Sequence, residues 1–444
     1  MKKYIILNIL FAVLVDALVQ GQIVPTRLRC EYLENPEVID VANPRLSWVN
    51  ITEKVERGQT QTAWEIRAAG TKEKLLNGHA DLWNSGKVSS SQSNNIYYKG
   101  KLLSSRQDCY WQVRTWDKKG KVSGWSKPAF WSMGLLDPNE WKARWIGAPW
   151  QGEEALPKPV FRRTADSVKK EPLPPPAPLL RKSFKITRTI ASARAYVTGL
   201  GFFEFYVNGR KVSKDVLVPN LTLFGKRPGL ENNYISIPDN FREYRVMYLS
   251  YDITRMLKKG ENVVGAILGN GFYNDPIRWT QSYGSPRFIG QIYITYTDGT
   301  QDVIVSDESW KAAKSPIVMD LIYGGEHYDA RLEQPGWCTA RFDDSQWKQV
   351  AIRKAPGGKM VAHMSPTDRV MEKIAPVKIK VLGKGKYRID FGQQISGWLH
   401  LLNVTGKAGQ KINIKYIIDQ PVGENSYTLK GGGPESYAAR FTWF

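Results

Sequence analysis

The chain has 444 residues, of which 42% are apolar, 24% charged and 12% aromatic, and this is the composition of a globular protein. It excludes a disordered chain, a collagen-like chain and a bundle of membrane helices. The 63 lysines and arginines exceed the 42 aspartates and glutamates by 21, so the formal charge is +21. The basic residues are scattered among acidic ones without a basic arm or recognition helix, so we expect no nucleic-acid partner.

The first 21 residues have the features of a secretory signal peptide. Lys2 and Lys3 precede a mostly apolar stretch that runs to Val19, and small residues stand before a cleavage point ahead of Gln22. No later segment of the sequence is apolar over the length that a membrane span requires. We therefore expect an exported protein without a membrane span, located in the periplasm or outside the cell.

Residues 22–147 predict a small β-sandwich. Short alternating runs such as 64–68 and 110–116 are separated by turn signals at the spacing of strands. Tryptophans stand near the start, at Trp48, and recur near the end of the segment. This aromatic pattern favours a fibronectin type III-like module.

The three cysteines, Cys30, Cys109 and Cys338, are odd in number and far apart in the sequence. This count indicates neither a disulfide framework nor a zinc site. Three buried thiols that act as small apolar side chains are the favoured interpretation, and one bridge between Cys30 and Cys109 stays open as the alternative.

Residues 148–178 contain a dense run of prolines in which neither a strand nor a helix can continue, so this segment is predicted to be a linker. Residues 179–355 then return to strand patterns. Within them Asn208-Gly209 and Asp298-Gly299 are flanked by alternating residues and predict hairpin turns. We expect this block to form a jelly-roll or lectin-like sandwich.

Residues 370–444 predict a third β block, with strands at 387–391, 397–401 and 411–416. Residues 441–444 have the pattern of a strand interior, so the sequence predicts an incomplete β-sandwich. Because no segment keeps a sustained helical period, the predicted fold class is all-β, with three consecutive β-sandwich domains.

Several motifs in these blocks are similar to those of one enzyme family. They are Asn-Pro-Arg-Leu-Ser-Trp at 43–48, Trp-Ile-Gly at 145–147, Gly-Leu-Gly-Phe-Phe-Glu at 199–204, Leu-Gly-Asn-Gly-Phe-Tyr at 268–273, Val-Ser-Asp-Glu-Ser-Trp at 305–310, Gly-Glu-His-Tyr-Asp-Ala-Arg at 325–331 and Asp-Phe-Gly-Gln-Gln-Ile-Ser-Gly-Trp at 390–398. In this order they resemble the amino-terminal β domains of bacterial α-L-rhamnosidases, glycoside hydrolase family 78.

The resemblance implies a secreted enzyme that removes terminal α-L-rhamnose from poly- or oligosaccharides by an inverting mechanism. In that family the β domains precede a large (α/α)6 barrel that carries the catalytic carboxylates and the rhamnose pocket. Nothing in this sequence corresponds to the barrel, so we expect an accessory amino-terminal part that is inactive alone. The alternative is a non-catalytic β-sandwich protein that binds carbohydrate.

Inverting glycoside hydrolysis requires a carboxylic acid and a carboxylate about 6.5–9.5 Å apart. By their spacing in the sequence, Glu326 and Asp329 are the best candidates. Positions three apart in a strand face opposite sides, however, so the two groups would not share a cleft without a bulge. The structural alternative pairs these carboxylates with Arg331 or makes them caps of a turn, and we expect no catalytic pair in this chain.

The middle block also resembles domains that hold rhamnose together with calcium. Asn270, Asn274 and Asp275 are the candidate oxygen ligands for Ca²⁺, which prefers carboxylate and amide oxygens. Tyr273 and Trp279 could offer aromatic faces to a sugar. The alternative is a tight turn in the glycine-rich segment, with the aromatic rings in the core. No other cofactor is expected.

Overall fold

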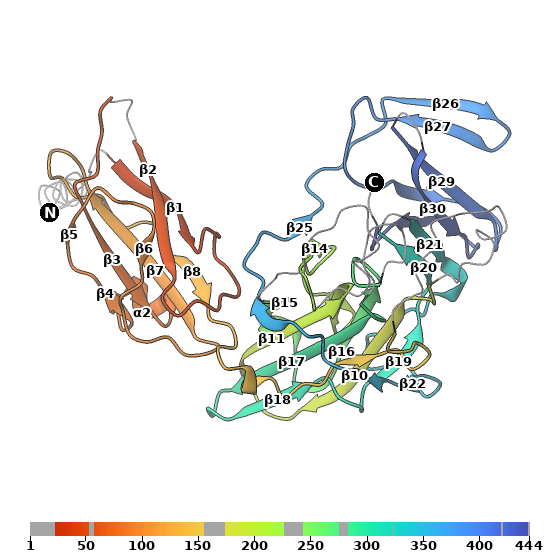
Figure 1. Cartoon of the computed structure of the whole chain (residues 1–444), viewed down its shortest axis with the longest axis horizontal. Coiled ribbons are helices and arrows are strands. Elements are labelled where there is room, and N and C mark those ends of the chain that lie inside the picture. The colour runs from red at the N-terminus through yellow and green to blue at the C-terminus, as the bar shows by residue number, and fades with distance from the viewer. Residues whose placement is uncertain are drawn as a thin grey trace, which may run out of the picture. The chain divides into compact units, whose positions relative to one another are not determined.

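In the computed structural model the chain is almost entirely β and divides into two compact units, which are described separately (Figure 1). Unit 1 comprises residues 1–140 with residues 362–366, and unit 2 comprises residues 141–361 and 367–444. The described residues are 23–52, 57–154, 174–225, 243–274, 283–322, 324–418 and 421–442. The expected signal peptide and most of the expected linker lie outside them. The predicted all-β class is confirmed.

Helices are few and short within the described part of the chain. They are α2 (Lys72–Leu76) and the 3-10 turns η2 (Pro138–Glu140), η4 (Thr254–Met256) and η5 (Ala330–Leu332). None of these is long and apolar enough to cross a bilayer.

Unit 1 is a sandwich of two sheets. The first has the strand order β1-β2-β6, and the second has the order β4-β3-β7-β8 with β5 added beside β3. Their bounds are β1 (Ile23–Cys30), β2 (Arg45–Thr52), β3 (Ala63–Ala69), β4 (Trp83–Asn84), β5 (Val88–Ser89), β6 (Ile96–Tyr97), β7 (Asp108–Trp116) and β8 (Ala129–Ser132). Alternate residues of both sheets point inward, as the period of two requires.

The core of unit 1 is rich in aromatic rings. Trp111 and Trp131 are fully buried and lie edge to face, with ring centroids 6.5 Å apart, and Trp48 and Trp64 pack in the same way at 6.0 Å. Such pairs add about 0.5–1.5 kcal/mol each to the burial of their surface. The tryptophan pattern in the sequence therefore reflects packing between the two sheets.

The three thiols are free and buried. Cys30 and Cys109 belong to the core of unit 1, where burial raises the pKa of both thiols, and burial raises the pKa of Cys338 to about 12. The thiolate is the reactive form of cysteine, so these groups are protected both by burial and by protonation.

We therefore expect iodoacetamide to label no cysteine in the folded chain and all three after unfolding without a reductant. Mass spectrometry of the intact chain under both conditions measures this. If only one cysteine accepts the label after unfolding, and three do once a reductant is added, a disulfide is present and the free-thiol arrangement is wrong.

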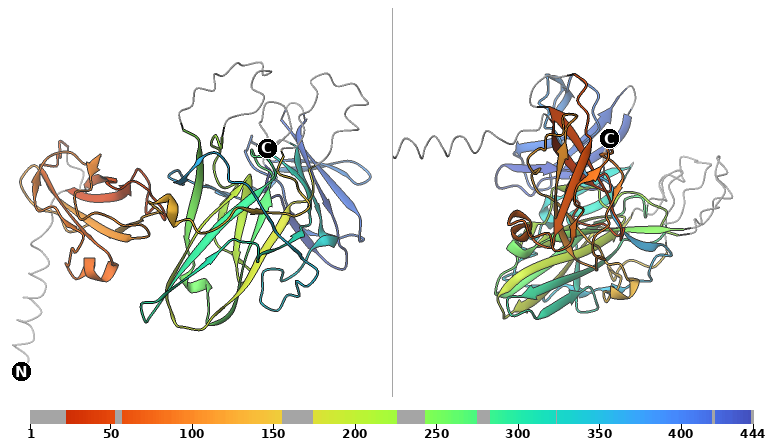
Figure 2. Two further views of the ribbon diagram at one scale, coloured as in Figure 1. Left: turned by 60° about the horizontal axis from the view of Figure 1, so that its bottom comes forward. Right: turned by 90° about the vertical axis from the view of Figure 1, so that its left-hand side faces the viewer.

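Unit 2 contains a larger sandwich of a six-stranded and a seven-stranded sheet, seen from different sides in Figures 1 and 2. The six-stranded sheet has the order β13-β12-β16-β10-β19-β22, and the seven-stranded sheet has the order β23-β9-β17-β11-β15-β24 with β18 paired to β17. Their bounds are β9 (Ile146–Gly147), β10 (Pro178–Ile186), β11 (Ile190–Leu200), β12 (Phe202–Val207), β13 (Arg210–Lys211), β15 (Arg245–Asp252), β16 (Gly260–Gly269), β17 (Arg287–Tyr296), β18 (Gln301–Val305), β19 (Lys311–Lys314), β22 (Lys348–Gln349), β23 (Ala351–Ile352) and β24 (Lys359–Ala362).

Apolar side chains from both sheets fill the space between them. Phe203 and Phe205 of β12 pack on Phe288 of β17, with centroid distances of 6.1 Å, and all three rings are buried. The strand at Ile146–Gly147, which the sequence analysis assigned to the first module, pairs with β17 and β23 in this sandwich. Ile146 is fully buried in the same core, which explains its place here.

Both predicted hairpin turns are confirmed. Asn208 and Gly209 join β12 to β13 with φ angles of +49° and +81°, the left-handed values that a two-residue type I′ turn requires. Asp298-Gly299 joins β17 to β18, with Gly299 at φ +82°. In both turns the residues with positive φ include the glycine that tolerates it.

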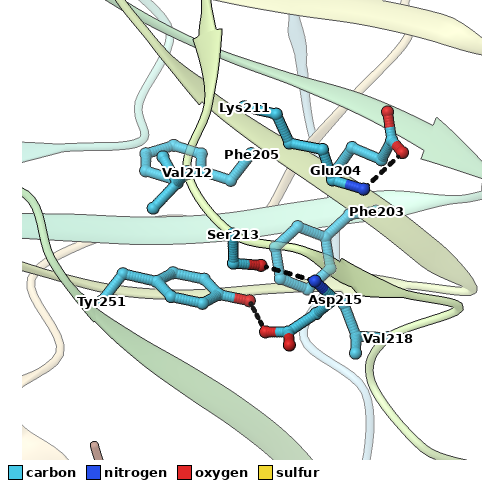
Figure 3. A pocket seen from close by; sticks show the side chains of 9 residues that line it. All are labelled: Phe203, Glu204, Phe205, Lys211, Val212, Ser213, Asp215, Val218 and Tyr251. Carbon is cyan, nitrogen blue, oxygen red and sulfur yellow. Dashed lines mark hydrogen bonds and ion pairs between the residues drawn. The ribbon is translucent and has the colours of Figure 1, made fainter. Parts of the chain in front are cut away.

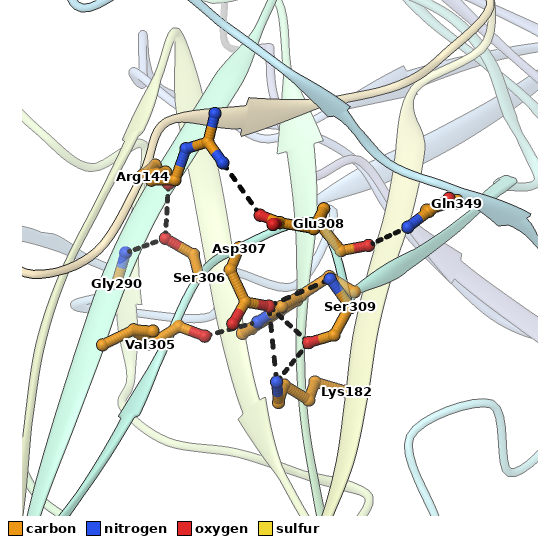
Figure 4. A network of polar contacts seen from close by, with 10 residues as sticks. Arg144, Lys182, Gly290, Val305, Ser306, Asp307, Glu308, Ser309 and Gln349 are labelled. Atoms are coloured by element: carbon orange, nitrogen blue, oxygen red, sulfur yellow. Dashed lines mark hydrogen bonds and ion pairs between the residues drawn. The ribbon is translucent and has the colours of Figure 1, made fainter.

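The turn between β18 and β19 ties several strands together through polar contacts (Figure 4). Ser306 accepts a hydrogen bond from the Gly290 N–H at 3.1 Å and donates one to the Arg144 carbonyl at 2.6 Å. Asp307 accepts the Ser309 N–H at 3.0 Å and pairs with Lys182 at 3.3 Å. These contacts give the Val-Ser-Asp-Glu-Ser-Trp motif a structural role.

The remaining strands of unit 2 form one four-stranded and three two-stranded sheets. The four-stranded sheet has the order β20-β21-β30-β29, and the pairs are β14-β25, β26-β27 and β28-β31. Their bounds are β14 (Asp215–Val216), β20 (Ile317–Leu321), β21 (Gly325–Asp329), β25 (Asp368–Arg369), β26 (Lys378–Gly383), β27 (Lys386–Asp390), β28 (His400–Val404), β29 (Lys411–Ile417), β30 (Pro421–Thr428) and β31 (Glu435–Ala438).

Two features of this last region differ from the expectation. Strand β21 pairs in parallel with β30, so strands of the middle and third predicted blocks share one sheet. The expected strand interior at 441–444 is wrong for its described residues, because β31 ends at Ala438 and neither Phe441 nor Thr442 is in a strand. Phe441 is instead a buried ring in an apolar cluster, and its N–H is directed to a carboxylate.

Candidate functional site

Glu326 is the second residue of β21 and is completely buried. Its carboxylate accepts three hydrogen bonds: from the Tyr437 hydroxyl at 3.0 Å, from the Arg440 N–H at 2.9 Å and from the Phe441 N–H at 3.2 Å. Burial raises the pKa of Glu326, and the hydrogen bonds from the segment that follows β31 oppose this rise only in part.

A second buried carboxylate, Glu204 of β12, is held by the same segment. Its oxygens accept hydrogen bonds from Arg440 Nη1 at 2.7 Å, from Lys211 Nζ at 2.7 Å and from the Tyr206 hydroxyl at 2.6 Å. The Arg440 side chain is 35% exposed, whereas that of Glu204 is 8% exposed. Arg440 therefore binds one carboxylate with its guanidinium and the other with its main chain.

The two carboxylates have opposite pKa shifts. Burial raises the pKa of Glu204, but the charges of Arg440 and Lys211 and their hydrogen bonds outweigh it and bring the pKa down to about 2. The pKa of Glu326 is raised. Carboxylate pairs with separated pKa values are typical of acid and base catalysts, so this pair has to be tested for access to a substrate.

The structure gives this pair no room for a sugar. Glu204 and Lys211 border a shallow hollow with about 190 Å³ of empty space, part of it open solvent (Figure 3). Glu326 has no exposed surface at all. The arrangement can hold two sheets together, but it does not present an acid and a base to a glycosidic oxygen.

The same hollow is bordered by Asp215, which is buried and fully paired. It accepts hydrogen bonds from the Tyr251 hydroxyl at 3.2 Å, the Thr367 hydroxyl at 2.7 Å and Arg369 Nε at 3.0 Å. Burial raises the pKa of Asp215, and these partners bring it below its usual value. Asp215 therefore fixes β14 to the segment around β25.

Asp329 does not join Glu326. Its carboxylate caps the 3-10 turn η5 by accepting the Arg331 N–H at 3.1 Å, and it also pairs with the Arg331 guanidinium at 2.7 Å. The hydrogen bond to the Arg331 side chain holds the pKa of Asp329 below its usual value. The sequence-predicted pair is thus split between a buried network and a surface cap.

Two of the three candidate calcium ligands, Asn270 and Asn274, are bonded to protein groups. Asn270 donates from its side chain to Asp320 at 3.1 Å, and its Oδ1 accepts from Asn274 Nδ2 at 2.7 Å. The Asn270 N–H donates to the Asp320 carboxylate at 2.6 Å. Within the described ranges, no group of three histidine, cysteine, aspartate or glutamate side chains is placed to hold a metal ion. Asp275 lies outside the described residues, so the calcium site as a whole stays a prediction.

Tyr273, the candidate sugar-stacking ring that the structure describes, has no face open to a ligand. Tyr273 is buried and stacks on Tyr283 with ring centroids 5.7 Å apart, while Phe224 packs edge to face against it. Trp279, the second candidate ring, lies outside the described residues. Gly271 has φ +48°, and the Tyr273 N–H donates to the Asn270 carbonyl at 3.2 Å, so this segment is a tight turn.

An exposed apolar surface on β26 and β27 was missed by the sequence analysis. Ile379 pairs with Ile389 and Val381 with Tyr387, and directly opposed residues share one face of a hairpin. These four side chains, which we name the apolar hairpin face, are between 37% and 66% exposed. The opposite face carries Lys and Arg. The alternation of lysine with Ile and Val at 378–381 could have indicated this surface, because such alternation is typical of a strand with one buried face.

Comparison with known proteins supports the resemblance found in the sequence. A family profile described as "Alpha-L-rhamnosidase N-terminal domain" matches residues 188–235 and 238–372. A second, described as "Rha78A-like, N-terminal immunoglobulin domain", matches residues 25–137. The module that was expected to be fibronectin type III-like is therefore assigned to an immunoglobulin-type domain, which is also a sandwich of two sheets.

Two curated α-L-rhamnosidases are similar over most of this chain. One from Formosa agariphila is 34% identical over 440 residues, which cover 92% of this chain and 44% of the relative. One from an Alteromonas species is 32% identical over 399 residues, which cover 88% and 40%. The chain spans about half the length of the curated relatives it matches.

Solved structures of α-L-rhamnosidases have the same fold. That from Dictyoglumus thermophilum is 32% identical, with a TM-score of 0.77 over 94% of this chain and 45% of the other. That from Streptomyces avermitilis, complexed with L-rhamnose, is 24% identical, with a TM-score of 0.79 over 95% and 55%. The fold and the matched profiles define a glycosidase class built from β-sandwich domains. The chain belongs to the α-L-rhamnosidase family and carries its amino-terminal domains.

We expect Glu204→Gln to lower the free energy of unfolding of unit 2 by about 3 kcal/mol at pH 7. A pKa that is lowered from 4.5 to about 2 stabilises the fold above pH 4.5, and this stabilisation is lost as the pH falls toward 2. The difference between the two proteins should therefore shrink over that range. Urea unfolding followed by tryptophan fluorescence at several pH values measures it.

Glu308→Gln is the matched control, because Glu308 also pairs with an arginine but both side chains are more than half exposed. It should cost less than about 1 kcal/mol. Equal losses for the two variants, or a Glu204→Gln effect that is independent of pH, would show that the network does not stabilise the fold in this way.

Proposed function

We propose that this chain is an accessory part of a secreted α-L-rhamnosidase that removes terminal α-L-rhamnose from glycans with inversion of configuration. Its membership in the family supports the reaction type. The signal-peptide pattern of residues 1–21 supports export. Glu204 and Glu326 have no space for a sugar beside them, which supports a catalytic acid and base elsewhere in the enzyme.

The apolar hairpin face is the observation that carries this proposal. A two-stranded hairpin is marginally stable by itself, and here both strands are exposed along their whole length. Val377 and Met371, just before β26, are also exposed. An apolar surface of this kind marks a protein interface. The relatives are about twice as long as the matched region, so we propose that a further domain of the enzyme covers this surface.

Hydrolysis of a chromogenic α-L-rhamnoside tests the proposed function. We expect no activity from the chain of 444 residues and activity from a version extended through any coding sequence that follows Phe444. Activity of the shorter chain would contradict its accessory role, and Glu326→Gln and Asp329→Asn would then be the first variants to assay. Absence of activity in both versions would contradict the rhamnosidase assignment.

The stereochemical outcome has its own measurement. Proton NMR of the reaction of the extended version should show β-L-rhamnose as the first product, because an inverting enzyme delivers water to the face opposite the leaving group. The α anomer should grow in later by mutarotation. If α-L-rhamnose is the first product, the mechanism is retaining.

The exposed surface should make the chain of 444 residues prone to aggregation and able to bind the dye ANS. We expect the double substitution of Ile379→Thr and Val381→Thr to reduce both properties without lowering the melting temperature, since these side chains are exposed. Val303→Thr, at a singly exposed valine of β18, is the control and should change neither. A soluble, monomeric wild-type chain that binds no ANS would contradict the interface.

A further inference from the structure

A strained turn in unit 1 presents an exposed tyrosine. Cys30 and Leu33 exchange two backbone hydrogen bonds of 2.9 Å, and the two residues between them, Glu31 and Tyr32, have φ angles of +50° and +65°. These are the signs of a type I′ turn, which favours Asn-Gly because most side chains resist positive φ. At 208–209 the same chain does use Asn-Gly for a turn of this kind.

The contrast between the two turns indicates that Glu31 and Tyr32 are present for their side chains. Backbone strain of this kind persists where the surrounding structure holds it, and it is concentrated at functional sites. Here the surrounding contacts are specific. Tyr32 donates a hydrogen bond to Asn95 Oδ1 at 2.8 Å, and the Arg45 guanidinium lies 4.8 Å from the centre of its ring. The ring is fixed but still 55% exposed.

A second exposed tyrosine lies beside the first. Tyr97 of β6 is directly opposite Arg45 of β2, so the two side chains share the outer face of the three-stranded sheet. Tyr97 is 56% exposed. In the described part of the chain, neither its hydroxyl nor the Asn95 Nδ2 has a hydrogen-bond partner. Two rings and two free polar groups thus meet around one arginine.

The charges at this position are balanced. The Arg45 guanidinium bonds to both carboxylate oxygens of Glu31, with Nε–O distances of 3.2 and 3.1 Å. Glu31 is buried, so the pair holds Arg45 in place between the tyrosines. No net charge remains for an anionic ligand. A ligand that matches these groups has an apolar face for the rings, hydroxyls for the polar groups and no charge of its own.

Two tryptophan rings at the other sheet of unit 1, Trp116 and Trp125, do not offer the same surface. Arg67 lies over Trp125 at 4.2 Å from the ring centre, and Arg114 lies over both Trp125 and Trp116, at 4.8 and 5.4 Å. Lys87 also lies over Trp116. Because cations cover these rings, a sugar could not stack on them without displacing the cations. Tyr32 and Tyr97 are therefore better placed for a ligand than these two tryptophans.

We propose that Tyr32, Tyr97 and Asn95 form a binding site for a neutral sugar ring. A pyranose has C–H groups on its faces and hydroxyls at its rim, and this combination fits the site. A 6-deoxy sugar such as L-rhamnose has a methyl group in place of the hydroxymethyl group and so offers more apolar surface. The choice of a rhamnose-bearing glycan as the natural ligand rests on the proposed function. The site would bind the glycan in addition to the active site, as an anchor for the polymer.

The test is a titration of the full chain with methyl α-L-rhamnopyranoside, followed by NMR or calorimetry. Tyr97→Ala should weaken binding roughly three- to tenfold, the loss expected for one aromatic contact. Tyr97→Phe keeps the ring and should bind more tightly than Tyr97→Ala. Tyr110→Ala, the same substitution on the outer face of the other sheet, is the control and should bind like the wild type.

Tyr32→Asn separates binding from folding. Asparagine tolerates positive φ, so the melting temperature should not fall, while the affinity for the sugar should. Binding should also be insensitive to salt, because Glu31 neutralises Arg45.

Wild-type affinity in both Tyr97→Ala and Tyr32→Asn would overturn the proposal, as would binding that needs an acidic polymer and disappears in salt. If the wild type does not bind the rhamnoside while the extended chain hydrolyses one, the site is wrong and the proposed function stands. If the site binds and no version hydrolyses, the proposed function fails instead.

Discussion

In unit 2, two buried carboxylates fix the position of the segment that follows β31. Arg440 reaches Glu204, 236 positions earlier in the sequence, with its guanidinium, and its main-chain N–H donates to Glu326. Glu204 belongs to the six-stranded sheet and Glu326 to the four-stranded sheet. A buried carboxylate is costly unless it is paired, so each glutamate requires this segment in one position. The interaction thereby joins two sheets that share no strand.

Buried carboxylates with separated pKa values resemble a catalytic pair, and here space decides against that reading. Catalysis requires that the acid and the base reach the same substrate bond. Glu326 has no exposed surface, and Glu204 is saturated by Arg440, Lys211 and Tyr206. Burial, which raises the pKa of Glu326, and the cations that lower the pKa of Glu204 also keep a substrate away from the two carboxylates. Perturbed titration therefore reports a structural network in this chain.

Local features of the fold could be predicted from the sequence, whereas long-range pairings could not. The turn at Asn208-Gly209 and the alternation within β12 are encoded by neighbouring residues. The parallel pairing of β21 with β30 joins residues about a hundred positions apart, and no local pattern specifies it. For the same reason the sequence suggested Glu326 and Asp329 as partners, while the partners of Glu326 are Tyr437, Arg440 and Phe441. The apolar hairpin face could be predicted from the alternation of apolar and basic residues. Its exposure could not, because exposure depends on which other parts of the protein cover it.

Two surfaces of this chain expose side chains or hold backbone angles that cost stability. The chemistry of each surface indicates a different kind of partner. The apolar hairpin face consists of aliphatic side chains and one tyrosine, which gain most from an equally apolar protein surface. The surface around Tyr32 and Tyr97 instead combines rings with an amide, a hydroxyl and a neutralised arginine. A protein domain that covered those polar groups would have to satisfy each of them, whereas a sugar brings hydroxyls that do so. The first surface is therefore suited to a neighbouring domain and the second to a glycan.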